Sequence, residues 1–178
     1  GYIRFLGSDS SVAVRVGEAL KLLTPIANNS PNIVAEKQAT DVWYEIENFG
    51  WSNYSENGDD VIMKLGCSPS KIALVIKDIF DYCVENQYPI EMMVAPARGV
   101  IKCKIIGVVS VLTEAVAMFR KITSEVGGYA VVELAPTSSK KNIDVWGDPG
   151  FGLPLMRRLK EKLDPNGILN VGRYVEGL

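Results

Sequence analysis

Apolar residues follow helix-like and strand-like spacings in successive segments of the chain. Recurrence every three or four positions predicts amphipathic helices over residues 12–23, 39–49, 69–83, 110–126 and 155–163. Alternation with a period of two predicts strands over residues 2–6, 32–35, 60–65, 90–95, 100–106 and 129–134. The turn sequence Pro96-Ala97-Arg98-Gly99 joins two of these strands as a hairpin.

Between residues 60 and 134 the predicted order is strand, helix, strand, strand, helix, strand. This order is typical of the ferredoxin-like, split β-α-β arrangement, in which helices cover one face of an antiparallel sheet. We therefore predict an α+β fold, to which a C-terminal helix and an extended tail are added. The first segment adds another strand-helix-strand-helix unit. Residues 1–150 are expected to form the α+β domain, and residues 151–178 the C-terminal helix and tail.

The same periodicity predicts the core and the open face of the sheet. Phe80 and Phe119 lie on apolar helix stripes, so both are expected to be buried against the sheet. The face that the helices leave open carries basic, acidic and apolar residues, namely Arg4, Ile62, Lys64, Lys102, Lys104, Tyr129, Val131 and Glu133. Its excess of lysine favours an anionic ligand or an acidic partner, and the alternative is an ordinary solvated surface.

Composition excludes several classes of function. The 178 residues carry a formal net charge of −2, which argues against general nucleic-acid binding. The chain has no histidine, so Ser-His and Cys-His nucleophiles are excluded, as is the commonest zinc ligand. The three cysteines show no metal-binding spacing and are expected to be buried in a reducing compartment. No signal peptide or membrane span is evident, so we expect a cytoplasmic location, with any membrane association made through partner subunits.

The C-terminal segment is the most specific feature. A leucine stripe at Leu155, Leu159 and Leu163 ends at Asp164-Pro165, because proline cannot donate to the helix. The next residues include Leu169-Asn170-Val171-Gly172-Arg173. This pattern resembles the C-terminal end of the FAD-linked oxidases of the vanillyl-alcohol oxidase type, which have proline at the Val171 position. With the motif over residues 142–147, the segment is most similar to the FAD-binding subunits of glycolate oxidases.

The resemblance implies a function and a set of partners. In this family an N-terminal half holds FAD through a glycine-rich loop, and a C-terminal α+β cap forms the substrate site. The glycines here lack the strand-turn-helix context of a phosphate loop, so the chain is expected to be the cap of a longer protein and not to retain FAD alone. The implied partners are the FAD-binding domain of the same protein, a larger flavoprotein subunit and an iron-sulfur subunit.

The resemblance also implies a reaction and site residues. The enzyme would oxidise a small 2-hydroxy acid such as glycolate, with FAD as the hydride acceptor. Asn170, Gly172 and Arg173 would approach the cofactor. The anionic substrate needs a cation, for which the sheet-face residues Arg4, Lys64, Lys102 and Lys104 are the candidates, with Arg98 in the hairpin turn as another. Two alternatives stay open: a non-catalytic subunit-interaction module, and a ferredoxin-like module that binds a small ligand.

Overall fold

The chain forms two compact units in the computed structural model, which describes residues 1–34, 36–51 and 59–178. The units are Gly1–Tyr44 and Glu45–Leu178. The boundary expected near residue 150 does not coincide with this division, and it stays a prediction. In the described part of the chain, no helix is both long enough and apolar enough to cross a membrane.

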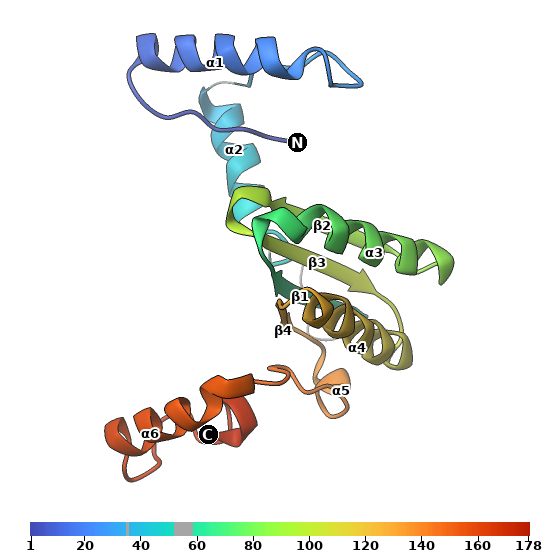
Figure 1. Cartoon of the computed structure of the whole chain (residues 1–178), viewed down its shortest axis with the longest axis vertical. Coiled ribbons are helices and arrows are strands. Elements are labelled where there is room, and N and C mark those ends of the chain that lie inside the picture. The colour runs from blue at the N-terminus through green and yellow to red at the C-terminus, as the bar shows by residue number, and fades with distance from the viewer. Residues whose placement is uncertain (35, 52–58) are drawn as a thin grey trace. The chain divides into compact units, whose positions relative to one another are not determined.

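The second unit is built on a four-stranded antiparallel sheet. Its strands are β1 (Asp60–Gly66), β2 (Ile90–Ala95), β3 (Val100–Ile106) and β4 (Tyr129–Leu134), in the spatial order β2-β3-β1-β4. Helices α3 (Ile72–Glu85) and α4 (Val109–Glu125) lie over the same face of the sheet (Figure 1). The predicted β-α-β-β-α-β order and the α+β fold class are therefore confirmed.

The core lies between this sheet and the two helices. From the strands it takes Val61, Met63, Leu65, Ile101, Cys103 and Ile105, and from the helices Ile72, Val75, Ile79, Cys83, Leu112, Ala115, Val116 and Phe119. Phe119 is fully buried, as predicted. Phe80 is 51% exposed, so its predicted burial is wrong. Phe80 lies at one margin of the apolar stripe around α3, so its side chain points partly away from the sheet.

The second face of the sheet is partly covered. Ile62 was expected on the open face, yet it is fully buried. Gly50, which follows helix α2 (Glu36–Glu47), packs against it with a left-handed backbone (φ +82°). A Cβ atom at Gly50 would lie 2.5 Å from Cδ1 of Ile62, so glycine permits this close approach. The central strand β1 is therefore buried on both faces.

The first unit contains helix α1 (Asp9–Leu23) and most of α2. The strands expected over residues 2–6 and 32–35 are wrong for residues 2–6 and 32–34, which are irregular, while residue 35 lies outside the described residues. Alternation gives a segment the side-chain pattern of a strand, but a strand also needs a neighbour for its backbone groups. Ile3 is 59% exposed, and α1 buries none of its residues.

The C-terminal part of the second unit continues from β4. A short helix, α5 (Thr137–Lys140), precedes the connector that leads to helix α6 (Leu153–Leu163). The backbone N–H of Val132 donates to the carbonyl of Val145 at 2.8 Å, so the connector lies along the outer edge of β4. The tail after α6 is not extended as expected. It turns at residues 164–169 and ends in a 3₁₀ turn at Val175–Gly177, which buries Val175.

Candidate functional site

A carboxylate organises the turn after α6. The Asp164 side chain accepts hydrogen bonds from the backbone N–H groups of Ile168 (2.9 Å) and Leu169 (3.0 Å) and from Lys160 Nζ (2.5 Å). The Lys160 hydrogen bond, followed by the two backbone hydrogen bonds, lowers the pKa of Asp164 to about 2. Lys160 also donates to the carbonyl of Leu169. Asp164 therefore ends helix α6 and also stabilises the turn that follows it.

An open groove of about 550 Å³ lies between α6 and the tail that follows it. This groove, called the C-terminal groove below, is mainly apolar and carries a few polar groups at its rim. It is lined by Trp146, Met156, Leu159, Lys160, Leu163, Asp164, Leu169, Asn170, Arg173, Tyr174 and Leu178. Its volume falls within the range of small-molecule sites, and its lining of apolar side chains with few polar groups is typical of them.

Two of the three residues implied to approach a cofactor line this groove together. Asn170 and Arg173 come from opposite ends of a short turn, in which the Arg173 N–H donates to the Asn170 carbonyl at 3.0 Å. Asn170 has φ +49° and Gly172 has φ +70°, so the backbone between them is left-handed at two positions. Asparagine and glycine tolerate that conformation best. Gly172 shapes the turn without lining the groove.

An aromatic pair forms one wall of the groove. The rings of Trp146 and Tyr174 meet edge to face, with centroids 5.3 Å apart. The indole Nε1 of Trp146 donates to the carbonyl of Arg173 at 3.3 Å. Trp146 therefore joins the connector to the tail. The sequence contained a signal for this role, because Trp146 belongs to the motif over residues 142–147 that carries part of the resemblance, but no site role was assigned to it.

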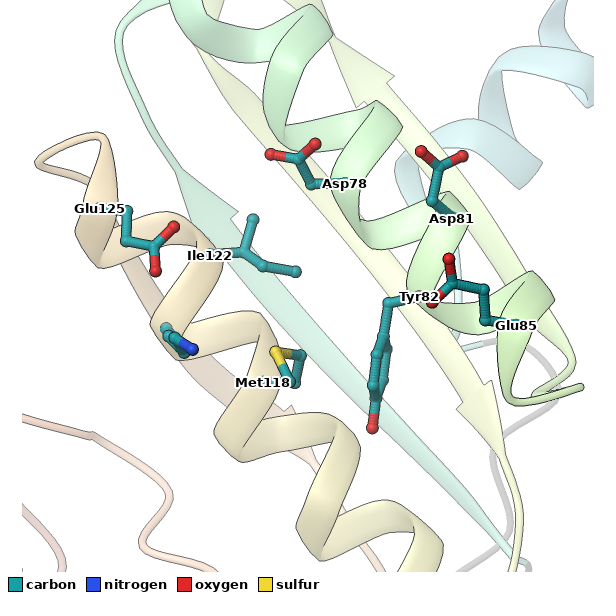
Figure 2. A pocket seen from close by; sticks show the side chains of 8 residues that line it. Asp78, Asp81, Tyr82, Glu85, Met118, Ile122 and Glu125 are labelled. Carbon is teal, nitrogen blue, oxygen red and sulfur yellow. The ribbon is translucent and has the colours of Figure 1, made fainter.

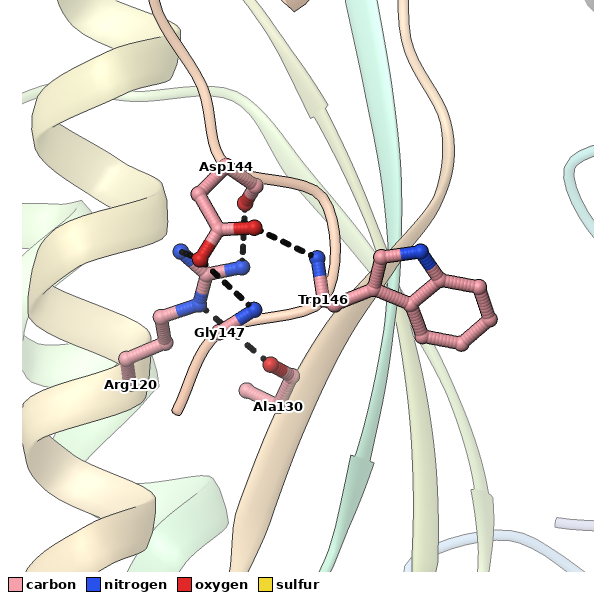
Figure 3. Close-up of polar contacts among 5 residues, drawn as sticks. All are labelled: Arg120, Ala130, Asp144, Trp146 and Gly147. Atoms are coloured by element: carbon pink, nitrogen blue, oxygen red, sulfur yellow. Dashed lines mark hydrogen bonds and ion pairs between the residues drawn. The ribbon is translucent and has the colours of Figure 1, made fainter. Parts of the chain in front are cut away.

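Arg120 on α4 anchors the connector to the sheet (Figure 3). Its guanidinium donates to the carbonyls of Ala130 (3.4 Å) and Asp144 and lies 4.0 Å from the Asp144 carboxylate. That carboxylate in turn accepts from the backbone N–H groups of Trp146 and Gly147, each at 3.0 Å. Burial lowers the pKa of Arg120, an effect that the neighbouring Asp144 opposes. Nothing in the sequence pattern singled out Arg120, because its partners are distant along the chain.

The sheet face is not the open basic surface that the alternation predicted. The Nζ of Lys102 lies 3.1 Å from Oε2 of Glu133, and the Nζ of Lys104 lies 3.6 Å from Oδ2 of the buried Asp60. Asp60 shares the alternation of Ile62 and Lys64, but it was not among the residues predicted for this face. These pairs neutralise two of the three lysines that the structure places there.

Lys64 lies directly opposite Lys102 in the β1–β3 register. Within the described residues it has no ion pair or hydrogen bond. Since Lys102 pairs with Glu133, Lys64 is the lysine of this face whose charge no carboxylate of the described residues compensates.

The remaining candidate cations are Arg4 and Arg98. Arg4 belongs to the first unit, where its guanidinium lies 5.4 Å from the centre of the Trp43 ring, a cation–π contact. Its assignment to the sheet face is wrong, because residues 2–6 form no strand. Arg98 lies in the 3₁₀ turn Pro96–Arg98 between β2 and β3 and is exposed.

A second, shallow groove of about 280 Å³ lies between α3 and α4 (Figure 2). It is lined by carboxylates and a few apolar side chains, namely Asp78, Asp81, Tyr82, Glu85, Met118, Lys121, Ile122 and Glu125. Lys77 pairs with Asp81 at 2.6 Å. Within residues 1–34, 36–51 and 59–178, no cluster of three or more histidine, cysteine or acidic side chains is arranged to hold a metal ion.

The cysteines are unpaired thiols. Cys83 and Cys103 are buried in the core, and Cys67 is half-buried. Burial raises the pKa of all three thiols, that of Cys83 to about 11. They are therefore neutral at physiological pH and poor nucleophiles.

Comparison of the chain with known protein families finds no match, and comparison with curated proteins finds none either.

Proposed function

We propose that this chain is the C-terminal cap of a flavin-dependent oxidoreductase that oxidises a small 2-hydroxy acid such as glycolate. The observation that carries the proposal is the fold of the C-terminal segment. The residues that resemble the oxidase pattern form a helix, an Asp164-centred turn and a groove that Asn170 and Arg173 line together. The β-α-β-β-α-β unit that precedes them agrees with an α+β cap.

The described residues suit contact with part of a flavin dinucleotide but not the binding of its pyrophosphate. Asn170 offers an amide and Arg173 a guanidinium at the rim of an apolar groove, and a guanidinium pairs well with phosphate or carboxylate. Gly127 and Gly128 lie between α4 and β4, a helix-to-strand junction. A Cβ atom at Gly128 would lie 2.4 Å from the carbonyl oxygen of Gly66, which indicates a packing role for that glycine. FAD, bound through another domain, would accept the hydride from the α-carbon of the substrate.

Lys64 is the residue we assign to the substrate carboxylate. It is the lysine of the sheet face that lacks a carboxylate partner among the described residues, whereas Lys102 opposite it pairs with Glu133. A bound carboxylate would pair with the Lys64 ammonium and fix the orientation of the 2-hydroxy acid. Lys102 and Lys104 then act through their ion pairs with Glu133 and Asp60, which hold the face in shape.

The test uses the protein that carries this chain, tagged at its native locus and purified with its partners. The proposal predicts bound FAD and a glycolate-dependent or lactate-dependent reduction of an artificial electron acceptor. Lys64→Met should raise KM for the hydroxy acid about tenfold or more, the effect of losing one charge-assisted contact of about 1.5–3 kcal/mol. Purified protein without flavin, and without such activity, would refute the proposal.

Asn170→Ala tests the C-terminal groove separately. It should lower flavin retention or activity. The free energy of unfolding should fall by no more than about 1–2 kcal/mol, because the Asn170 side chain is exposed and the loss comes from its left-handed backbone (φ +49°), which alanine tolerates less well than asparagine. Asn166→Ala is the control, since Asn166 is an exposed asparagine of the preceding turn that does not line the groove. Equal behaviour of the two variants would show that the groove has no part in flavin binding.

The alternative functions are a non-catalytic subunit-interaction module and a module that binds a small ligand without chemistry. A flavin-free protein that still forms a defined complex would favour the first. A flavin-free protein that binds small carboxylic acids through Lys64 would favour the second.

A further inference from the structure

The sheet face that carries Lys64 is covered at one end of β1. Ile62 is fully buried there, and Gly50 packs against its side chain. Glu133 lies close to the level of Ile62 in β4, and its ion pair with Lys102 of β3 spans β1, the strand between them. An acid whose carboxylate binds Lys64 is therefore directed toward the opposite end of β1.

That opposite end carries an aromatic ring, and a glycine permits its position. Gly66 lies two residues after Lys64 on the same face, between Val100 of β3 and Tyr129 of β4 in the register. A Cβ atom at Gly66 would lie 2.3 Å from Cε1 and 2.5 Å from Cζ of Tyr129. The outer part of the ring therefore lies over the β1 backbone, a position that a larger residue would block. Tyr129 is 52% exposed, so a ligand can reach the ring.

A charged row and an apolar row thus lie side by side on this face. Val131 lies opposite Lys64 in the first row, and the Tyr129 ring and Val100 belong to the second. The two rows are about 6–7 Å apart, twice the rise per residue of a strand. A chain of about five or six carbons spans that distance at about 1.5 Å per bond. Glycolate, with two carbons, is too short to reach the ring from Lys64.

We propose that the acid oxidised by this protein carries an apolar side chain of about four carbons, which packs on the Tyr129 ring beside Val131. The inference rests on the proposed function, because it takes Lys64 as the partner of the substrate carboxylate. It makes Tyr129 a residue that determines specificity. Apolar area leaves water when such a side chain covers the ring, and glycolate gains nothing from this contact because its α-carbon carries no side chain.

Binding of two acids that lack the 2-hydroxyl group tests the contact apart from the flavin chemistry. The probes are 4-methylpentanoate, which is long enough to reach Tyr129, and acetate, its short counterpart. Calorimetric titration of the protein purified with its partners should give a Kd at least about tenfold lower for 4-methylpentanoate, the gain expected from about two buried methylene groups. Lys64→Met should raise both Kd values by similar factors, because both acids have the carboxylate.

Variants at the ring locate the preference. Tyr129→Ala should reduce the ratio of the two Kd values about fivefold by weakening 4-methylpentanoate alone, whereas Tyr129→Phe should preserve the ratio, because the ring makes the contact. Gly66→Ala should also reduce the ratio, since its Cβ would displace the ring. Phe80→Ala is the matched control, because Phe80 is an aromatic residue of similar exposure (51%) on α3, which covers the other face of the sheet. It should leave both Kd values unchanged.

Turnover separates this inference from the function on which it rests. The kcat/KM for 2-hydroxy-4-methylpentanoate should exceed that for glycolate about tenfold, and Tyr129→Ala should remove the difference. A flavin-containing protein that oxidises both acids equally well, or whose preference survives Tyr129→Ala, would overturn the inference and leave the proposed function standing. A flavin-free protein that binds 4-methylpentanoate through Lys64 and Tyr129 would refute the oxidase and support the contact at the ring.

Discussion

Phe119 and Phe80 form a matched pair, because the sequence predicted the same environment for both and the structure separates them. Phe119 is fully buried among strands and helices, whereas half of Phe80 is exposed. Phe119→Ala is expected to lower the free energy of unfolding by about 3–5 kcal/mol, from the lost transfer energy and the cavity that remains. The edge-to-face contact with Tyr82, at a centroid distance of 6.4 Å, accounts for about 0.5–1.5 kcal/mol of that loss.

Phe80→Ala should cost far less. Fully burying a phenylalanine side chain contributes about 1.5–3 kcal/mol, and roughly half of this ring is in contact with the protein. The expected loss is therefore about 1 kcal/mol. Urea denaturation followed by circular dichroism measures both variants, and unchanged m-values would show that the comparison concerns the same two-state transition. Similar losses for the two variants would refute this account of the core.

Three other predictions follow from the connector, the tail and the thiols. The folded pKa of Asp164 is about 2, below its ordinary value of 3.8, so its carboxylate stabilises the turn fully above about pH 4 and loses that effect as the pH falls through 2. Amide chemical shifts of Ile168 and Leu169 should report a titration midpoint near 2. A midpoint near 3.8 would contradict the hydrogen-bond pattern. Arg120→Ala should release the connector from the sheet and shift the fluorescence of Trp146 to longer wavelength, measured in a variant whose other tryptophans are replaced. Lys121 is an exposed neighbour, so Lys121→Ala should leave this fluorescence unchanged. Cys67 should react first with a thiol reagent, and Cys83 and Cys103 only on unfolding; fast reaction of the Cys67→Ser variant would show that the core is open.

The sequence by itself determined the elements whose pattern repeats over several turns or pairs. The helix over 110–126, the hairpin at Pro96–Arg98 and the order of β1 to β4 were all predictable, because local spacing decides which face of each element is apolar. The helix that ends before Asp164-Pro165 was predictable for the same kind of reason, since proline removes a donor from the backbone.

The tertiary structure decided everything that depends on which segments meet. Residues 2–6 have the alternation of a strand but no neighbour to pair with, so they stay irregular. Alternation placed Lys102, Lys104 and Glu133 on one face, but the ion pairs of Lys102 with Glu133 and of Lys104 with Asp60 depend on which strands are neighbours. Arg120 is joined to Asp144, and Trp146 to Tyr174, across gaps of more than twenty residues in the chain. Periodicity specifies which side chains share a face, whereas pairing, charge compensation and exposure depend on distances between segments that only the folded chain brings together.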